Sequence, residues 1–225
     1  MNLAIYGAGG LGHEVLDLAR HIQEITKQVS ESIFFVVDEK YIVDGLFKNE
    51  YMSCPIYGFD NVCNRFSAEE VEFVIALGEP DDRKRLYEQV KEKGYRFKTL
   101  IHPSANISPS AVIGEGTIVQ SCSTISSDAQ VGKNCFFQSM ALLGHDCIVN
   151  DHSVISSHVA ISGHVKIGDN VYIAPGVMVK DRLQIGSNSV IGMGSNVQRN
   201  IPDNVIALGN PARPMKHKDD KKVFR

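Results

Sequence analysis

The sequence has no excess of positive charge and no long apolar run. Its 225 residues include 23 lysines and arginines against 26 aspartates and glutamates, which gives a net charge of −3. Without a basic stripe, nucleic acid is not an expected partner. No apolar run approaches the roughly eighteen residues that a membrane-spanning helix needs. These absences argue against a nucleic-acid-binding protein and against a membrane-spanning one.

Cysteine is scarce and unpatterned. Cys54, Cys63, Cys122, Cys135 and Cys147 show neither paired spacing nor the spacing of metal ligands. Cys135 and Cys147 fall at positions predicted to point inward, so we interpret them as small core residues. The N-terminus enters a predicted strand almost at once, without the basic start and cleavage site of a signal peptide. We therefore expect a protein of the reducing cytoplasm.

The second half of the chain carries an apolar residue at every sixth position, in unbroken register. These anchors are Ile107, Ile113, Val119, Ile125, Val131, Phe137, Leu143, Val149, Ile155, Ile161, Ile167, Ile173, Val179, Ile185, Ile191 and Val197. A period of six fits neither an amphipathic helix nor a single alternating strand. It is typical of a hexapeptide β-solenoid, in which each hexad supplies one strand and one turn. Three hexads close a triangular coil, so residues eighteen apart are predicted to stack.

Two further positions in each hexad fit this solenoid. The residue two places before each anchor is small or β-branched, as a narrow core requires: Ala111, Thr117, Ser123, Ala129, Cys135, Ala141, Cys147, Ser153, Val159, Val165, Val171 and Val177. Glycine and asparagine follow many anchors, where we expect turns with positive φ. These turn residues are Gly114, Gly132, Gly168 and Gly186, with Asn134, Asn170 and Asn188.

The first hundred residues alternate between predicted strands and helices. The expected strands are Leu3–Tyr6, Ile33–Val37, Val71–Leu77 and Arg96–Ile101, with one helix after Gly12 and another from Asp81 to Lys93. This alternation predicts a small α/β domain with a parallel sheet. We expect the α/β domain to cover residues 1–102, the solenoid to cover residues 103–215, and residues 216–225 to form a polar tail.

A glycine turn joins the first strand to the first helix. Gly7, Gly9 and Gly12 form a G-x-G-x-x-G pattern, whose backbone N–H groups can face a phosphate. A tight packing turn is the alternative interpretation. Asp38, at the end of the second strand, is the acidic residue that a nucleotide site requires. About a hundred residues is small for a full dinucleotide domain, and no hydride-transfer site follows, so we favour a sugar nucleotide over NAD.

His145 is the candidate catalytic residue. It lies on a predicted outward corner, and Asp146 directly follows it. A carboxylate beside an imidazole can orient it and suit it to act as a general base near neutral pH. Eighteen residues on stand Gly163 and His164, so we expect His145 beside Gly163 and Asp146 beside His164. The open N–H of Gly163 could hold an oxyanion.

Three other histidines recur at six-residue spacing. His152, His158 and His164 fall on three different faces of the solenoid, which argues against a zinc cluster within one subunit. The simplest interpretation is three solvated turn residues. A zinc site shared across a trimer interface, as in the gamma-class carbonic anhydrases, is the alternative.

Several segments together resemble a known family, the bacterial sugar O- and N-acetyltransferases of the sialic-acid and bacillosamine-pathway type. The resemblance covers nearly the whole chain and rests on Tyr6–Gly10, Ile75–Gly78, Gly144–Ile148, Ser162–Gly168, Ile191–Ser195 and Gly209–Arg213. It implies a Rossmann-like N-terminal domain that binds a nucleotide-linked sugar. It also implies a left-handed parallel β-helix, a homotrimer, and acetyl-CoA lying along the solenoid between two subunits, with no metal.

The resemblance also implies roles for individual residues. His145 matches the general base, Asp146 its acidic partner, and Gly163 a position near the thioester carbonyl. The implied acetyl-CoA contacts are Val154, Gly163, Pro175, Gly192, Met193 and Gly194; the implied nucleotide-sugar contacts are Gly9, Gly10, Leu11, Gly12, Asp38, Glu39 and Gly78. Val154 replaces a second histidine found in some relatives. Leu11 replaces a histidine of several relatives, while His13 comes two residues later.

We therefore predict an acetyl-CoA-dependent N-acetyltransferase of a nucleotide-linked 4-amino-4,6-dideoxy sugar, with His145 as general base. A sugar O-acetyltransferase of the sialic-acid type is the first alternative. A non-catalytic trimer that binds a nucleotide sugar is the second. The predicted partners are an amino sugar and two further copies of the chain.

Overall fold

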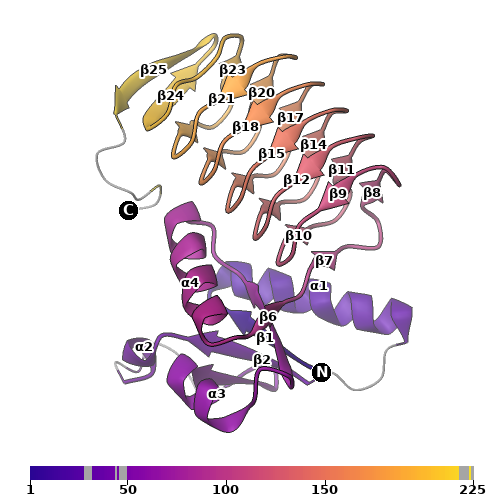
Figure 1. Ribbon diagram of the computed structural model, residues 1–225, viewed down its shortest axis with the longest axis vertical. Coiled ribbons are helices and arrows are strands. Elements are labelled where there is room, and N and C mark those ends of the chain that lie inside the picture. Colours follow the sequence, from indigo (N-terminus) through magenta and orange to yellow (C-terminus); the bar gives the residue numbers. More distant parts are fainter. Residues whose placement is uncertain (28–31, 44, 46–49, 218–222, 224–225) are drawn as a thin grey trace.

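The structure is a computed structural model that describes residues 1–27, 32–43, 45, 50–217 and 223. Figure 1 shows an α/β domain below a stack of triangular coils whose strands run in three parallel sheets. This arrangement is the predicted fold class, an α/β N-terminal domain followed by a left-handed parallel β-helix. Within the described residues, no helix is long and apolar enough to cross a membrane.

The α/β domain is built on a six-stranded sheet of order β3-β4-β2-β1-β5-β6. Its elements are β1 (Asn2–Tyr6), α1 (Gly10–Thr26), β2 (Ile33–Val37), α2 (Glu39–Val43), β3 (Glu50–Tyr51), β4 (Cys54–Gly58), α3 (Phe59–Arg65), β5 (Val71–Ile75), α4 (Pro80–Glu92) and β6 (Arg96–Phe97). The central strand β1 pairs in parallel with β2 on one side and β5 on the other. The strand order therefore reverses at β1, and ligands of open α/β sheets bind at the carboxyl ends of such strands.

The segment before the β-helix differs from the prediction. The single strand expected over Arg96–Ile101 is two short strands in different sheets. The first, β6, pairs with β5, whereas β7 (Leu100–Ile101) pairs with β10 in the first coil of the β-helix. The prediction failed because the local sequence of this segment marks extended backbone but does not show which sheet each of its two parts joins.

Three sheets form the sides of the β-helix. The first contains β7, β10 (Ile118–Val119), β13 (Phe136–Phe137), β16 (Val154–Ile155), β19 (Tyr172–Ile173) and β22 (Val190–Ile191). The second contains β8 (Asn106–Ile107), β11 (Thr124–Ile125), β14 (Leu142–Leu143), β17 (Ala160–Ile161), β20 (Met178–Val179) and β23 (Asn196–Val197). The third contains β9 (Val112–Ile113), β12 (Gln130–Val131), β15 (Ile148–Val149), β18 (Lys166–Ile167) and β21 (Gln184–Ile185).

From β7 to β23, every strand pairing between neighbouring coils joins residues eighteen apart. Leu143, for example, pairs with Ile161, and Ile161 pairs with Val179. The anchors from Val119 to Val197 are buried inside the prism and form one continuous apolar cluster with the small inward residues. Cys135 and Cys147 belong to this cluster, and all five cysteines are free thiols. The predicted register therefore holds along the whole stack.

The turn glycines are required for a different reason than predicted. Asn134, Asn170 and Asn188 do have positive φ, but Gly114, Gly132, Gly168 and Gly186 do not. A Cβ at Gly114 would lie 2.6 Å from the backbone of the next coil, and similar contacts occur at the other three. These glycines are therefore explained by close packing between coils, because a side chain has no room there.

The β-helix ends in a hairpin, β24 (Val205–Gly209) and β25 (Ala212–His217), which extends the first sheet. Lys216 and His217 of the predicted polar tail end β25. Residues 218–222 and 224–225 of that tail lie outside the described residues.

The first sheet of the β-helix packs against the α/β domain. Leu16 and Leu18 of α1 belong to the same buried apolar cluster as Ile118, Phe136 and Val154 of the β-helix. Figure 1 shows α1 and α4 on the side of the domain that faces the coils, with α3 on the far side. The two domains therefore share one apolar core.

A buried arginine adds hydrogen bonds across this domain interface. The Arg83 side chain on α4 is fully buried. Its Nη1 donates to the carbonyl oxygens of Ile75 (2.5 Å) and Leu77 (3.0 Å), and its Nη2 to Asn134 O (2.7 Å) and Oδ1 (2.9 Å). Burial lowers the pKa of Arg83 to about 10, so the guanidinium stays charged at neutral pH. It therefore joins the end of β5 to a corner of the β-helix.

We expect Arg83→Met to lower the free energy of unfolding by ~3–5 kcal/mol, because the buried carbonyls would lose their donor. Urea unfolding followed by circular dichroism measures this change. Lys84→Met, at the exposed neighbouring position, is the matched control. Equal stability of the two variants would contradict a structural role for the buried guanidinium.

Candidate functional site

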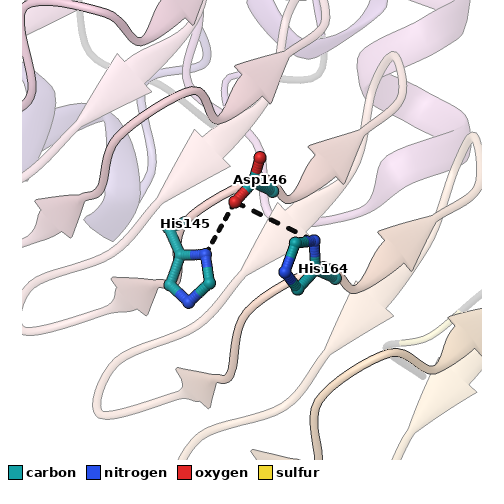
Figure 2. Close-up of side chains that lie close together, drawn as sticks. All are labelled: His145, Asp146 and His164. Carbon is teal, nitrogen blue, oxygen red and sulfur yellow. Dashed lines mark hydrogen bonds and ion pairs between the residues drawn. The ribbon is translucent and has the colours of Figure 1, made fainter.

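The candidate base lies on the edge between the second and third sheets. His145 sits in the turn between β14 and β15, and its side chain is 58% exposed. Its Nδ1 lies 2.7 Å from Oδ2 of Asp146 (Figure 2). Because a carboxylate can only accept, Nδ1 carries the proton in the neutral ring, and Nε2 of that tautomer presents a lone pair. This is the protonation pattern of a general base.

Asp146 contacts a second imidazole on the next coil. His164 Nδ1 lies 3.8 Å from the same Oδ2 atom, and the His145 and His164 rings meet edge to face at 5.0 Å (Figure 2). The hydrogen bond from His145 lowers the pKa of Asp146, with a further contribution from the charge on His164. Asp146 therefore stays ionised at neutral pH beside both rings.

Gly163 leaves room for the ring of His145. A Cβ at Gly163 would lie 2.6 Å from His145 Nε2 and 2.7 Å from Cε1. No hydrogen bond within the described part of the chain uses the Gly163 N–H, since only its carbonyl is bonded, to the N–H of Arg182. The structure thus places a free backbone donor beside the candidate base.

The other residues expected to bind acetyl-CoA lie elsewhere. Pro175 and Gly192–Gly194 form turns between the first and second sheets, and Gly194 N donates to Pro175 O at 3.0 Å. Met193 is 75% exposed on this edge. Val154 is fully buried in the cluster shared with α1, so its side chain does not reach the His145 corner. One chain therefore does not bring these residues to His145.

A second candidate site lies at the carboxyl ends of β1, β2 and β5. The hollow has a volume of about 320 Å³ and is lined by Tyr6, Gly7, Ala8, Gly9, Val37, Asp38, Tyr41, Leu77, Asp82, Arg85 and Leu86. Tyr6 Oη donates to Asp38 Oδ1 at 2.6 Å, and an Arg85 nitrogen lies 3.5 Å from Asp38 Oδ2. Burial, followed by this hydrogen bond, raises the pKa of Tyr6. Asp38 is therefore an oriented acceptor on the wall of the hollow.

The glycine turn borders this hollow. A Cβ at Gly9 or Gly10 would meet nothing within 4 Å, so a ligand can approach the backbone there. A Cβ at Gly12 would lie 2.0 Å from the carbonyl oxygen of Gly7, so Gly12 allows close packing of the helix on the strand. The turn thus has both an open side and a packed side.

Of the seven residues expected to bind the nucleotide sugar, only Gly9 and Asp38 line the hollow. The five that do not are Gly10, Leu11, Gly12, Glu39 and Gly78. The Glu39 carboxylate accepts from the Asn61 N–H at 3.2 Å, at the start of α3. Leu11 packs against the domain-interface cluster, and Gly78 lies just before α4. His13 stacks on Tyr51 with ring centroids 3.5 Å apart.

Sequence reasoning missed Tyr6, Asp82 and Arg85 as lining residues. Tyr6 is the last residue of β1, and its place at the carboxyl end of a central strand could have indicated that it lines a ligand site. Asp82 and Arg85 lie on the first turns of α4, whose packing beside the glycine turn no local pattern revealed.

The three histidines at six-residue spacing occupy three different edges, as expected. His152 is 8% exposed, and its Nδ1 lies 3.0 Å from Asn134 Nδ2. It is therefore an interface residue rather than a solvated one. Burial lowers the pKa of His152.

Comparison with known proteins gives two family matches. The description "PglD N-terminal domain" matches residues 2–90, and "Bacterial transferase hexapeptide (six repeats)" matches residues 164–199. The UDP-N-acetylbacillosamine N-acetyltransferase of Bacillus subtilis (strain 168) is 35% identical over 120 residues, which cover 53% of this chain and 51% of that protein. The matched segment thus spans about half the length of this curated relative.

Two solved structures share the fold over nearly their whole length. The acetyltransferase domain of PglB from Neisseria gonorrhoeae FA1090 has a TM-score of 0.85 and 29% identity, covering 95% of this chain and 99% of that one. The same domain has been solved with acetyl coenzyme A. A mutant of perosamine N-acetyltransferase from Caulobacter crescentus has a TM-score of 0.85 at 24% identity, covering 96% and 97%, and supports the fold.

We expect Gly163→Ala to displace the His145 ring with little loss of stability, because the clash falls on a side chain that can rotate. The imidazole NMR signals of His145 should shift, while the melting temperature should change by no more than about 2–4 °C. Gly144→Ala is the control, since a Cβ there would lie 2.7 Å from backbone atoms of the next coil and should destabilise the fold. Unchanged His145 signals in Gly163→Ala would contradict the contact.

Proposed function

Because the chain belongs to the bacterial sugar acetyltransferases that join a PglD-type N-terminal domain to a hexapeptide-repeat β-helix, we propose that it acetylates a nucleotide-linked 4-amino-4,6-dideoxy sugar from acetyl-CoA. The observation that carries the proposal is the His145–Asp146 pair beside the free N–H of Gly163. The named activities of the similar proteins supply the reaction type.

The described residues fit acetyl-CoA in two respects. The edge is open at Gly194, where a Cβ would meet nothing within 4 Å, whereas Gly192 lies against the side chain of Leu208. The exposed side chain of Met193 offers an apolar contact beside it. The Gly163 N–H is a donor without a protein partner in the described chain. When bound, acetyl-CoA supplies a thioester whose carbonyl carbon accepts a nucleophile.

In the proposed mechanism, His145 Nε2 removes a proton from the acceptor amine as the new C–N bond forms. The Gly163 N–H stabilises negative charge on the carbonyl oxygen. The C–S bond breaks, and the CoA sulfur takes a proton from His145. Asp146 keeps the imidazole in the tautomer with Nε2 free. The transfer is direct, so the reaction needs no acyl-enzyme.

The nucleotide portion of the acceptor is proposed to occupy the hollow at the carboxyl ends of the central strands. Gly9 and Gly10 leave the backbone open to a diphosphate, and within the described residues no side chain caps the N–H groups at the start of α1. Asp38 is oriented to accept from a ribose hydroxyl or a base N–H. Both groups lie at the point where the strand order reverses.

A homotrimer is proposed to complete the active site. His145 lies on one edge of the prism, whereas Pro175 and Gly192 lie on another, separated by the second sheet. The outer face of that sheet carries Leu142, Ala160 and Met178 in register, and Leu142 and Met178 are 44% and 54% exposed. An apolar stripe between the two edges suits contact with a second copy. The free thiols fit our proposal of a reducing cytoplasm.

We expect His145→Ala to lower kcat by roughly 10²–10⁴-fold, because the amine loses its base. The assay follows CoA thiol release from acetyl-CoA with UDP-, GDP- and dTDP-linked 4-amino sugars and with free sialic acid. His21→Ala, which removes an exposed imidazole from α1, is the control.

The assay separates the alternatives. Turnover with sialic acid alone would move the protein to the O-acetyl branch. A folded protein that binds the nucleotide sugar but releases no CoA with any acceptor would favour a scaffold. Full activity of His145→Ala would remove this residue from the mechanism.

We expect Asp38→Asn to raise the KM for the nucleotide sugar by about 10- to 100-fold, because a hydrogen bond to a charged group contributes ~1.5–3 kcal/mol. The value of kcat at saturating acceptor should change little, since Asp38 is remote from the thioester. Steady-state kinetics measures the effects on KM and on kcat separately, and Glu69→Gln is the surface control. A loss confined to kcat would contradict binding in this hollow.

A further inference from the structure

Two imidazoles lie beside the Asp146 side chain. Its exposed carboxylate has no hydrogen bond in the described part of the chain except the one from His145 at 2.7 Å. The remaining close partner is His164, whose Nδ1 lies 3.8 Å from the same oxygen atom. Figure 2 shows Asp146 above and between the two rings. Oδ2 of Asp146 therefore lies between the two rings and is hydrogen-bonded to one of them.

The backbone fixes where His164 stands. Asp146, His164 and Arg182 occupy the same turn position on three successive coils, with φ of 58°, 59° and 61°. The His164 N–H donates to the carbonyl oxygen of His145 at 2.9 Å, and the Arg182 N–H donates to that of Gly163 at 3.0 Å. The register thus holds the His164 ring next to the candidate base and its carboxylate.

After His145, His164 is the nearest partner of the Asp146 carboxylate among the described residues. Arg182 lies one coil further on, and its Nε is 3.6 Å from the carboxylate of Asp181. Its charge acts on Asp146 only as a weaker influence. Asp128 occupies the same turn position one coil below, and a carboxylate cannot donate a hydrogen bond to Asp146.

We propose that His164 is a positioning residue for the acetyl transfer, acting through Asp146. An N–H at its Nδ1 holds the Asp146 carboxylate in the orientation that accepts from His145, and so keeps Nε2 of His145 directed at the acceptor. This inference rests on the proposed function and adds a third residue to the His145–Asp146 pair. His164 itself exchanges no proton with the substrate.

The test compares three substitutions in the 225-residue protein. His164→Leu should lower kcat by about 3- to 10-fold, because a less constrained carboxylate orients the base less often. His164→Asn should restore most of the activity, since the Asn Nδ2 can take the place of the imidazole Nδ1. The KM values for acetyl-CoA and for the acceptor should stay unchanged in both His164 variants. Their melting temperatures should also stay unchanged. Asn188→Ala, a substitution at the same turn position on another edge, is the control.

A double-mutant cycle shows whether the effect passes through Asp146. In an Asp146→Asn background, His164→Leu should cause no further loss of kcat. Additive losses, or equal activity of the Leu and Asn variants, would overturn the inference. A wild-type protein that turns over no acceptor would instead contradict the proposed function. In that case the His145 imidazole NMR signals of the His164 variants still test the positioning, since they should shift in His164→Leu and return toward wild type in His164→Asn.

Discussion

Parallel pairing between residues eighteen apart is the constraint on which the rest of the structure depends. Each anchor fills the narrow interior, so a slip of one residue would turn an apolar side chain out of the core. The turns at the edges of the prism follow the same spacing, so turn residues eighteen apart also stack. This spacing therefore sets His145 beside Gly163 and Asp146 beside His164, although none of these four residues contributes to the core. The core thus positions the candidate site without taking part in it.

A second constraint couples this site to the hollow in the α/β domain. Arg83 donates to carbonyl oxygens at the end of β5 and to Asn134 on the β-helix. Leu77, which receives one of these bonds, also lines the hollow. The guanidinium is therefore well suited to fixing the hollow relative to the coils. A nucleotide held in one domain would then present its sugar in a constant direction.

The sequence predicts the features of this protein that come from its repeat or from elements that are neighbours along the chain. The hexad period is enough to place His145 beside Gly163, and the alternation of elements is enough to place Asp38 at a strand end. The sequence does not predict the role of Arg83, because its partner Asn134 lies in the other domain, fifty-one residues away. The glycines after the anchors show the same limit. Their sequence pattern marks a turn, but only the contact between coils shows that Gly114 is needed for space rather than for positive φ.

The three-sided shape also restricts how a complete active site could form. The candidate base and the glycines of the proposed acetyl-CoA path lie on different edges, and the second sheet stands between them. His145 is 58% exposed and Met193 is 75% exposed, so packing within the chain explains the position of neither side chain. An extended cofactor that contacts both must lie against one edge of one copy and another edge of its neighbour. If both sets of residues serve one reaction, self-association is a condition of catalysis, and the apolar stripe at Leu142 and Met178 supplies a surface for it.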